Sequence, residues 1–208
     1  MKNLLVGQSG GPTAVINASL YGVVKEALKM PGIDHVYGMI NGIEGLLQDH
    51  YMDLGAELSG EDLELLKLTP AAFLGSCRYK LPENLTDAFY ETVFEKFRQM
   101  EIGYFLYIGG NDSMDTVSKL SRYAKHHGSD IRFIGIPKTI DNDLIMTDHT
   151  PGYGSAAKYV AAAVREIALD ASVYQQKAVT IVELMGRHAG WLTAASVLAR
   201  KFEGDNPV

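Results

Sequence analysis

The stretch NLLVGQSGGPTAVINASLYGVVKEALK, residues 3–29, decides the fold class of this chain. It opens with a short apolar run at residues 3–7, turns at the consecutive glycines Gly10 and Gly11, and continues with helical periodicity over residues 12–29. A short apolar run without polar alternation is typical of a strand that is covered on both faces, as in parallel sheets. The stretch therefore predicts a strand–loop–helix unit of an α/β protein.

The same unit recurs along the chain. Four further apolar runs of five or six residues end at a glycine, a proline or a polar residue, and they predict strands at residues 35–39, 104–108, 132–136 and 179–184. Periodic patterns predict helices over residues 12–29, 83–100, 113–127, 155–170 and 190–201. Ser113 is the predicted N-cap of the third helix, and Tyr159 is expected on the buried face of the fourth. Residues 51–68 indicate one or two helical turns at most. The prediction is a mostly parallel sheet with helices on both faces, in three layers with right-handed crossovers.

Composition narrows the function classes. The 208 residues fit one large α/β domain or two small ones. The formal net charge of −6, from 19 Lys and Arg against 25 Asp and Glu, argues against a nucleic-acid partner, which would call for a basic surface. The single cysteine, Cys77, cannot form an internal disulfide, and no apolar stretch approaches the ~20 residues of a membrane span. We therefore expect a cytoplasmic protein with no nucleic-acid and no membrane partner.

Glycine-rich loops follow the first and third predicted strands. In an open parallel sheet, ligands bind beyond the carboxyl ends of the strands. Gly10 and Gly11 would let backbone N–H groups approach a phosphate, although a tight turn alone would explain them about equally well. In the other loop, Asp112 follows Gly110 and could hold a Mg²⁺ that bridges phosphate oxygens, or could serve only as a helix cap.

Two carboxylates, Asp141 and Asp143, follow the fourth predicted strand, with Lys138 and Thr139 just before them. Asp and Asn favour turns, but a preference for turns alone does not readily explain two carboxylates beside a lysine and a threonine. A functional site explains this cluster better. A carboxylate beside a substrate hydroxyl could accept its proton, while Lys138 neutralises a moving phosphoryl group.

Two arginines occupy turns that could face a phosphate. Arg187 follows the last predicted strand, and Arg78 follows a Gly-Ser turn. Each guanidinium offers a planar fork of donors, although a lone arginine is more often a surface ion-pair partner. His188 is expected to pack or to hydrogen-bond, because no second His or Cys lies at metal-ligand spacing.

Taken together, these loops resemble the 6-phosphofructokinase family. The matching stretches occur in the family's order over nearly the whole chain, at residues 9–11, 73–78, 109–113, 137–143 and 185–187. The runs Thr-Ile-Asp-Asn-Asp and Met-Gly-Arg are the most specific of them. The resemblance implies a Rossmann-like fold and the reversible phosphorylation of fructose 6-phosphate to fructose 1,6-bisphosphate in glycolysis.

The resemblance also implies residue roles. Asp141 would be the base that accepts the proton of the sugar 1-hydroxyl, with Arg187, Lys138 and Thr139 as the other catalytic residues. The sugar phosphate would contact Thr139, Ile140, Asp141, Met185, Gly186 and Arg187. The phosphoryl donor would contact Gly10, Gly11, Arg78, Gly110, Asp112, Ser113 and Lys138. The ligands of Mg²⁺ would be Asn111, Asp112 and Asp143, of which Asn111 stands where family members commonly have an Asp.

Two positions bear on the donor. ATP-dependent members usually have Gly where this chain has Asp112 and Lys138. A carboxylate there would occupy space that a nucleotide needs, and a lysine would balance the charge of a small polyphosphate, so the chain looks like the pyrophosphate-dependent subgroup. An ATP-dependent 6-phosphofructokinase remains an alternative, as does a non-catalytic, regulatory or phosphate-binding half-protein.

The chain covers about the first half of the family's usual length, and it ends after a predicted helix, where an α/β pattern would enter another strand. We therefore expect residues 1–208 to be the donor-binding and catalytic domain, and the family's second domain to be absent from this chain. The resemblance also implies a homo-oligomer. Lys177 lies within one residue of the place where the family offers a basic residue to a neighbouring subunit's sugar site.

Overall fold

The computed structural model describes residues 2–201, and the chain divides into two compact units, residues 1–138 and 139–208. The expectation that residues 1–208 form one catalytic domain stays a prediction.

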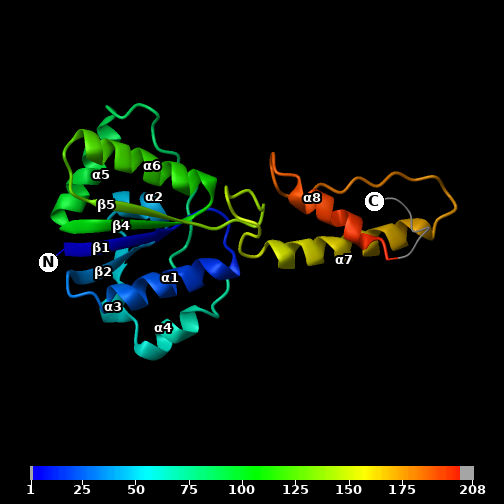
Figure 1. Cartoon of the computed structure of the whole chain (residues 1–208), viewed down its shortest axis with the longest axis horizontal. Helices are drawn as coiled ribbons and strands as arrows, with labels where there is room; N and C mark the ends of the chain where they lie inside the picture. The colour runs from blue at the N-terminus through cyan, green and yellow to red at the C-terminus, as the bar shows by residue number, and fades with distance from the viewer. Residues whose placement is uncertain (1, 202–208) are drawn as a thin grey trace. The chain divides into compact units, whose positions relative to one another are not determined.

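A five-stranded sheet with strand order β3-β2-β1-β4-β5 organises the first unit (Figure 1). Its strands are β1 (Lys2–Gln8), β2 (Ile33–Met39), β3 (Tyr51–Asp53), β4 (Ile102–Gly109) and β5 (Arg132–Pro137). β1 pairs in parallel with β2 and β4, and β4 pairs in parallel with β5. Only β3 is antiparallel, against β2. The carboxyl ends of β1, β4 and β5 therefore lie at one edge of the sheet.

Helices cover both faces of this sheet (Figure 1). They are α1 (Ala14–Ala27), α2 (Gly42–Leu47), α3 (Leu54–Glu57), α4 (Gly60–Leu66), α5 (Ala88–Gln99) and α6 (Asn111–His126). Successive side chains of a strand point to opposite faces, and β1 follows this rule: Leu5 packs with α2, α5 and α6, while Leu4 and Val6 pack with α1, α3 and α4. The expected α/β class, a mostly parallel sheet between helices, is confirmed.

The second unit is helical in the part that the structure describes. It contains α7 (Tyr153–Ser172), α8 (Trp191–Ala195) and a 3₁₀ helix (Ser196–Ala199). Val160 and Val164 of α7 pack against Ala199 and Leu184. No helix within residues 2–201 is both long and apolar enough to cross a membrane.

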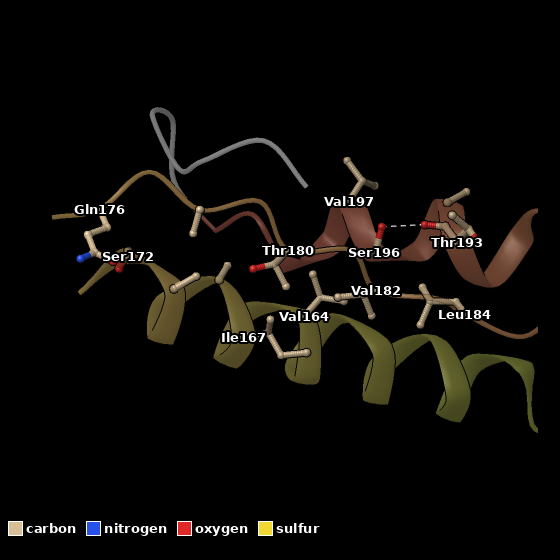
Figure 2. Close-up of a pocket in the computed structure, with 14 residues that line it drawn as sticks. Val164, Ile167, Ser172, Gln176, Thr180, Val182, Leu184, Thr193, Ser196 and Val197 are labelled. Atoms are coloured by element: carbon tan, nitrogen blue, oxygen red, sulfur yellow. Dashed lines mark hydrogen bonds between the residues drawn. The ribbon is translucent and has the colours of Figure 1, made fainter. Parts of the chain in front are cut away.

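The strand predicted at residues 179–184 is wrong. This run has no regular secondary structure, because the described part of the second unit contains no other strand that could complete its hydrogen bonds. Its side chains still alternate: Figure 2 shows Thr180, Val182 and Leu184 lining a groove of about 680 Å³ together with Val164 and Ile167 of α7. The intervening Val179 and Ile181 are 90% and 89% exposed.

Other differences are local. The strand β3 was missed because three residues are too few to show a period. Helix α6 begins at Asn111 with Gly110 as its N-cap, so Ser113 is not the cap. The helix predicted over residues 190–201 is two shorter helices, α8 and the 3₁₀ helix. Tyr159 is 75% exposed and does not lie on the buried face of α7.

Candidate active site

The glycine loops that follow β1 and β4 touch each other. The Ser9 N–H donates to the Ile108 carbonyl at 2.9 Å, which keeps the first loop beside the end of β4. Gly10 has φ +79°, a left-handed conformation that favours glycine, and a Cβ placed there would lie 3.6 Å from the Gly110 nitrogen. The backbones of two strand ends are thus brought together at the N-terminus of α6, which suits an anion.

The loop after β5 joins them through Lys138. Its N–H donates to the Gly109 carbonyl at 2.9 Å, and its Nζ donates to the Gly11 carbonyl at 2.5 Å. The side chain is buried, at 5% exposure. A lysine is rarely buried unless it is paired, so this ammonium is a fixed positive charge among the three loops. Sequence reasoning assigned Lys138 to a bound phosphate and did not foresee its bond to the glycine loop.

A hydrogen bond between two buried serines joins the first two loops. Ser9 and Ser113 are buried, and their hydroxyls form a hydrogen bond to each other. A Cβ at Gly109 would lie 2.0 Å from the Ser113 Oγ and 2.8 Å from the Ser9 carbonyl oxygen, so this position accepts only glycine. Ser113 therefore fixes the loops from within the protein, and its expected role in donor binding stays a prediction.

The loop of residues 73–78 is a fourth part of this cluster. The Ser76 Oγ donates to the Gly10 carbonyl at 2.5 Å, and the Gly10 N–H donates to the Cys77 carbonyl at 3.4 Å. Arg78 follows directly and is exposed. The sequence did not reveal this connection, because these residues lie 66 positions apart along the chain.

A buried phenol lies under the glycine loop. Tyr107 of β4 is 2% exposed, and its hydroxyl lies 3.5 Å from the Cys77 Sγ. Burial, and then the neighbouring Cys77, raises the pKa of Tyr107 far above its usual value. The phenol is therefore neutral at working pH and contributes packing to the loop.

The first turn of α6 carries the oxygen ligands that the sequence assigned to Mg²⁺. Asn111 and Asp112 are both exposed there. A carboxylate at a helix N-terminus is stabilised by the helix dipole, and oxygen ligands are those that Mg²⁺ prefers. Within residues 2–201, no group of three or more His, Cys, Asp or Glu side chains gathers as a metal site. A Mg²⁺ at Asn111 and Asp112 would take its remaining ligands from substrate and water.

In the second unit, Asn142 fixes the loop that carries Asp141 and Asp143. Asn142 has the left-handed φ of 58°, which an Asn tolerates better than most residues, and it is buried. Its Nδ2 donates to the Asp148 carbonyl at 3.2 Å, and its Oδ1 accepts from the Thr150 N–H at 2.8 Å.

The other side of the same loop is held by Thr139, whose Oγ1 accepts from the Asp141 N–H at 3.0 Å. Ile140 is half-buried in this loop. The two candidate carboxylates, Asp141 and Asp143, are half-buried and lie directly before and after Asn142. Asp143 also lines a cavity of about 540 Å³ within this unit.

The turn of residues 185–187 is tight and strained. Gly186 has φ 138°, and a Cβ there would lie 2.4 Å from the Ala189 carbonyl oxygen, so glycine is required. Arg187 adopts a left-handed φ of 50°, which costs a non-glycine residue of order 1–3 kcal/mol. Strained residues are often found at functional sites, so the strain is consistent with a functional role for the Arg187 guanidinium. Met185, Arg187 and His188 are exposed, as is Lys177.

Sequence reasoning missed two buried polar residues beside the glycine loop, Gln8 and Asn17, which are both 0% exposed. The available signal was Asn17 itself, since an amide between Ile16 and Leu20 interrupts the apolar face of a predicted helix.

Comparison with known proteins now decides the family. The family model described as phosphofructokinase matches residues 3–203. This chain belongs to the phosphofructokinase family. Its relatives include proteins named pyrophosphate–fructose 6-phosphate 1-phosphotransferase from Xanthomonas campestris, 49% identical over 99% of this chain, and from Rhodospirillum rubrum, 46% identical over 98% of it.

The fold agrees with solved phosphofructokinase structures. The pyrophosphate-dependent phosphofructokinase of Marinobacter aquaeolei superposes with a TM-score of 0.81 at 47% identity, over 100% of this chain and 52% of that one. The chain covers 49% of the length of each of the two curated relatives, so it spans about half of the proteins that it matches.

Proposed function

We propose that this chain carries the donor-binding and catalytic residues of a phosphotransferase that uses pyrophosphate to phosphorylate the 1-hydroxyl of fructose 6-phosphate. The observation that carries the proposal is the meeting of three loops at the ends of β1, β4 and β5, with the Lys138 ammonium buried on the Gly11 carbonyl. The N-terminus of α6 and one buried cation suit a small polyanion. The names of the relatives support the same donor and acceptor.

The chemistry follows from the residue types. The sugar 1-hydroxyl oxygen bonds to a phosphorus of pyrophosphate, the bridging P–O bond breaks, and phosphate leaves. Asp141 accepts the hydroxyl proton, since a carboxylate can act as the general base of phosphoryl transfer. Arg187 and Lys138 stabilise the charge on the transferring group. Thr139, Ile140, Met185 and Gly186 complete the sugar side, whereas Gly10, Gly110, Ser113 and Arg78 belong to the donor side.

A Mg²⁺ ion is part of the proposal. Asn111 and Asp112 would hold it through oxygen atoms, and the ion would neutralise phosphate charge when bound. The expected role of Asp143 as a further ligand stays a prediction. Asp112 also supports pyrophosphate over ATP, because its side chain would occupy space that the rest of a nucleotide needs. We further propose that the protein is cytoplasmic and forms a homo-oligomer.

The test of the catalytic assignment is Asp141→Asn. Loss of the proton acceptor is expected to lower turnover by at least ~10², with little change in thermal stability. Asp148→Asn is the matched control, since it neutralises an exposed carboxylate of the same loop and is expected to keep turnover within about twofold of the original. Turnover in Asp141→Asn within threefold of the original protein would refute the role of Asp141.

Calorimetry tests the alternative that this chain is a non-catalytic phosphate-binding protein. Heat of pyrophosphate binding without any product, in a preparation that holds Mg²⁺ and fructose 6-phosphate, would favour a non-catalytic phosphate-binding protein.

A further inference from the structure

Two fully buried amides, Gln8 and Asn17, join the end of β1 to the first turn of α1. Both side chains are 0% exposed. The Gln8 Nε2 donates to the Asn17 Oδ1 at 3.0 Å and to the Ile16 carbonyl at 3.1 Å. A buried amide is costly unless it is hydrogen-bonded, so the partners of these two side chains show what they hold in place.

Their remaining hydrogen bonds all go to one distant segment. The Asn17 Nδ2 donates to the Thr69 carbonyl at 2.8 Å, and the Asn17 Oδ1 accepts from the Phe73 N–H at 2.8 Å. The Gln8 Oε1 accepts from the Leu74 N–H at 2.9 Å. Residues 69–78 form no helix or strand, so these side chains supply the partners that a ladder would otherwise give.

The held segment runs directly into the glycine loop. Two residues beyond Leu74, the Ser76 hydroxyl donates to the Gly10 carbonyl, and the Cys77 carbonyl accepts from the Gly10 N–H. Gln8 lies two residues before Gly10, so it holds residue 74 while Gly10 contacts residues 76 and 77. One short set of hydrogen bonds therefore fixes the distance between the Gly10 backbone and Arg78.

We propose that Gln8 and Asn17 are positioning residues for the phosphoryl donor. They form an amide clamp, defined as these two side chains with their bonds to residues 69–74, that presets Arg78 and the glycine loop for one polyanion. The inference rests on the proposed function, because it gives the clamp a purpose in pyrophosphate binding. Neither amide is placed in contact with substrate: each acts through the backbone that it holds.

Preorganisation is the physical reason. A loop that is already in its binding conformation loses little conformational entropy when the ligand arrives, and this gain appears as affinity. A clamp that merely stabilised the fold would change melting temperature and leave affinity unchanged.

The experiment uses the full chain and two near-isosteric variants. Asn17→Leu removes both anchors on Thr69 and Phe73, and Gln8→Met removes the acceptor for the Leu74 N–H. Val24→Ala is the matched control, because it shortens a fully buried apolar side chain farther along α1 that makes none of the clamp's hydrogen bonds. Hydrogen exchange of peptides within residues 69–78 is measured together with calorimetric binding of pyrophosphate and Mg²⁺.

Both clamp variants are expected to exchange faster in residues 69–78 and to raise the Kd for pyrophosphate by about tenfold, equivalent to ~1.4 kcal/mol. Val24→Ala is expected to lower the melting temperature while the Kd stays within twofold. If Asn17→Leu does not fold, the exchange and the Kd measured for Gln8→Met alone test the proposal.

Two results would overturn the inference while the proposed function stands: unchanged exchange in residues 69–78, or an unchanged Kd for pyrophosphate in a variant whose exchange is faster. If the unsubstituted protein binds no pyrophosphate, the proposed function fails, and with it the clamp's role in donor binding. The exchange data then still show whether the amides hold the segment.

Discussion

Replacing Lys138 with methionine removes one charge while keeping most of the length of the side chain. The Lys138 ammonium is buried and donates to the Gly11 carbonyl, so the change deletes a charge-assisted hydrogen bond and a fixed cation beside the glycine loops. Hydrogen bonds of charged groups contribute about 1.5–3 kcal/mol, which corresponds to a factor of roughly ten to a hundred in an equilibrium constant. We expect the KM for pyrophosphate to rise by about that factor, and the KM for fructose 6-phosphate to stay within twofold.

A second buried lysine supplies the control. Lys119 of α6 is 4% exposed and is paired with Glu83 and Asp115, at 2.6 and 2.8 Å. Lys119→Met should destabilise the protein, because the buried Leu81 carbonyl loses its donor, and leave the KM for pyrophosphate unchanged. Initial rates of fructose 1,6-bisphosphate formation, measured beside thermal melts, compare the two variants. Lys138 has no role in donor binding if the KM for pyrophosphate changes less than twofold in Lys138→Met, or changes equally in both variants.

Two further predictions test the loops and the surface. Asn142→Ala removes both bonds that close the loop around Asp141 and places alanine at φ 58°, so turnover measured at saturating substrates should fall by about tenfold or more, and an unchanged turnover would contradict the clamped loop. The pKa of Glu64 is lowered from 4.5 to about 2, first by the hydrogen bond from Lys67 and then by that from Tyr21. Because the folded value is depressed, this carboxylate stabilises the fold above pH 4.5, and that stabilisation is lost as the pH falls toward 2. Urea titrations between pH 2 and 6 should show a shallower loss of stability in Glu64→Gln than in the original protein, and identical slopes would count against the assignment.

The sequence predicted the strands and loops whose signals are local. The runs at residues 3–7, 35–39, 104–108 and 132–136 became strands because each is a short, mostly apolar run with a parallel neighbour to pair with. The run at residues 179–184 carries the same signal and is not a strand. An apolar run shows that a strand can form there, but pairing depends on a neighbour, which the described part of the second unit does not supply.

Helix boundaries show a second limit. Ser113 has the right chemistry for an N-cap, yet the helix begins two residues earlier and the serine hydroxyl bonds to Ser9. A residue type that can cap a helix can equally bond across a loop, and only the contact with β1 separates the two uses.

The candidate site was predictable where glycines and charges follow a strand. Gly10, Gly110 and Lys138 were expected at one edge of the sheet, and the structure brings them together there. The amide clamp was not predictable from spacing, because Gln8 and Leu74 lie 66 residues apart and neither residue type signals a site. Buried side-chain networks depend on long-range packing, so a single sequence reveals the odd polar residue but not its partner.

The preference of the chain for pyrophosphate over ATP can be measured in one assay. Initial rates are measured on the full chain at saturating fructose 6-phosphate and Mg²⁺, with pyrophosphate in one series and ATP in the other. We predict that pyrophosphate supports a rate at least ~100-fold above that with ATP, the discrimination expected when about 3 kcal/mol separates the two donors. An equal or faster rate with ATP would show that the loops at the ends of β1, β4 and β5 do not select pyrophosphate.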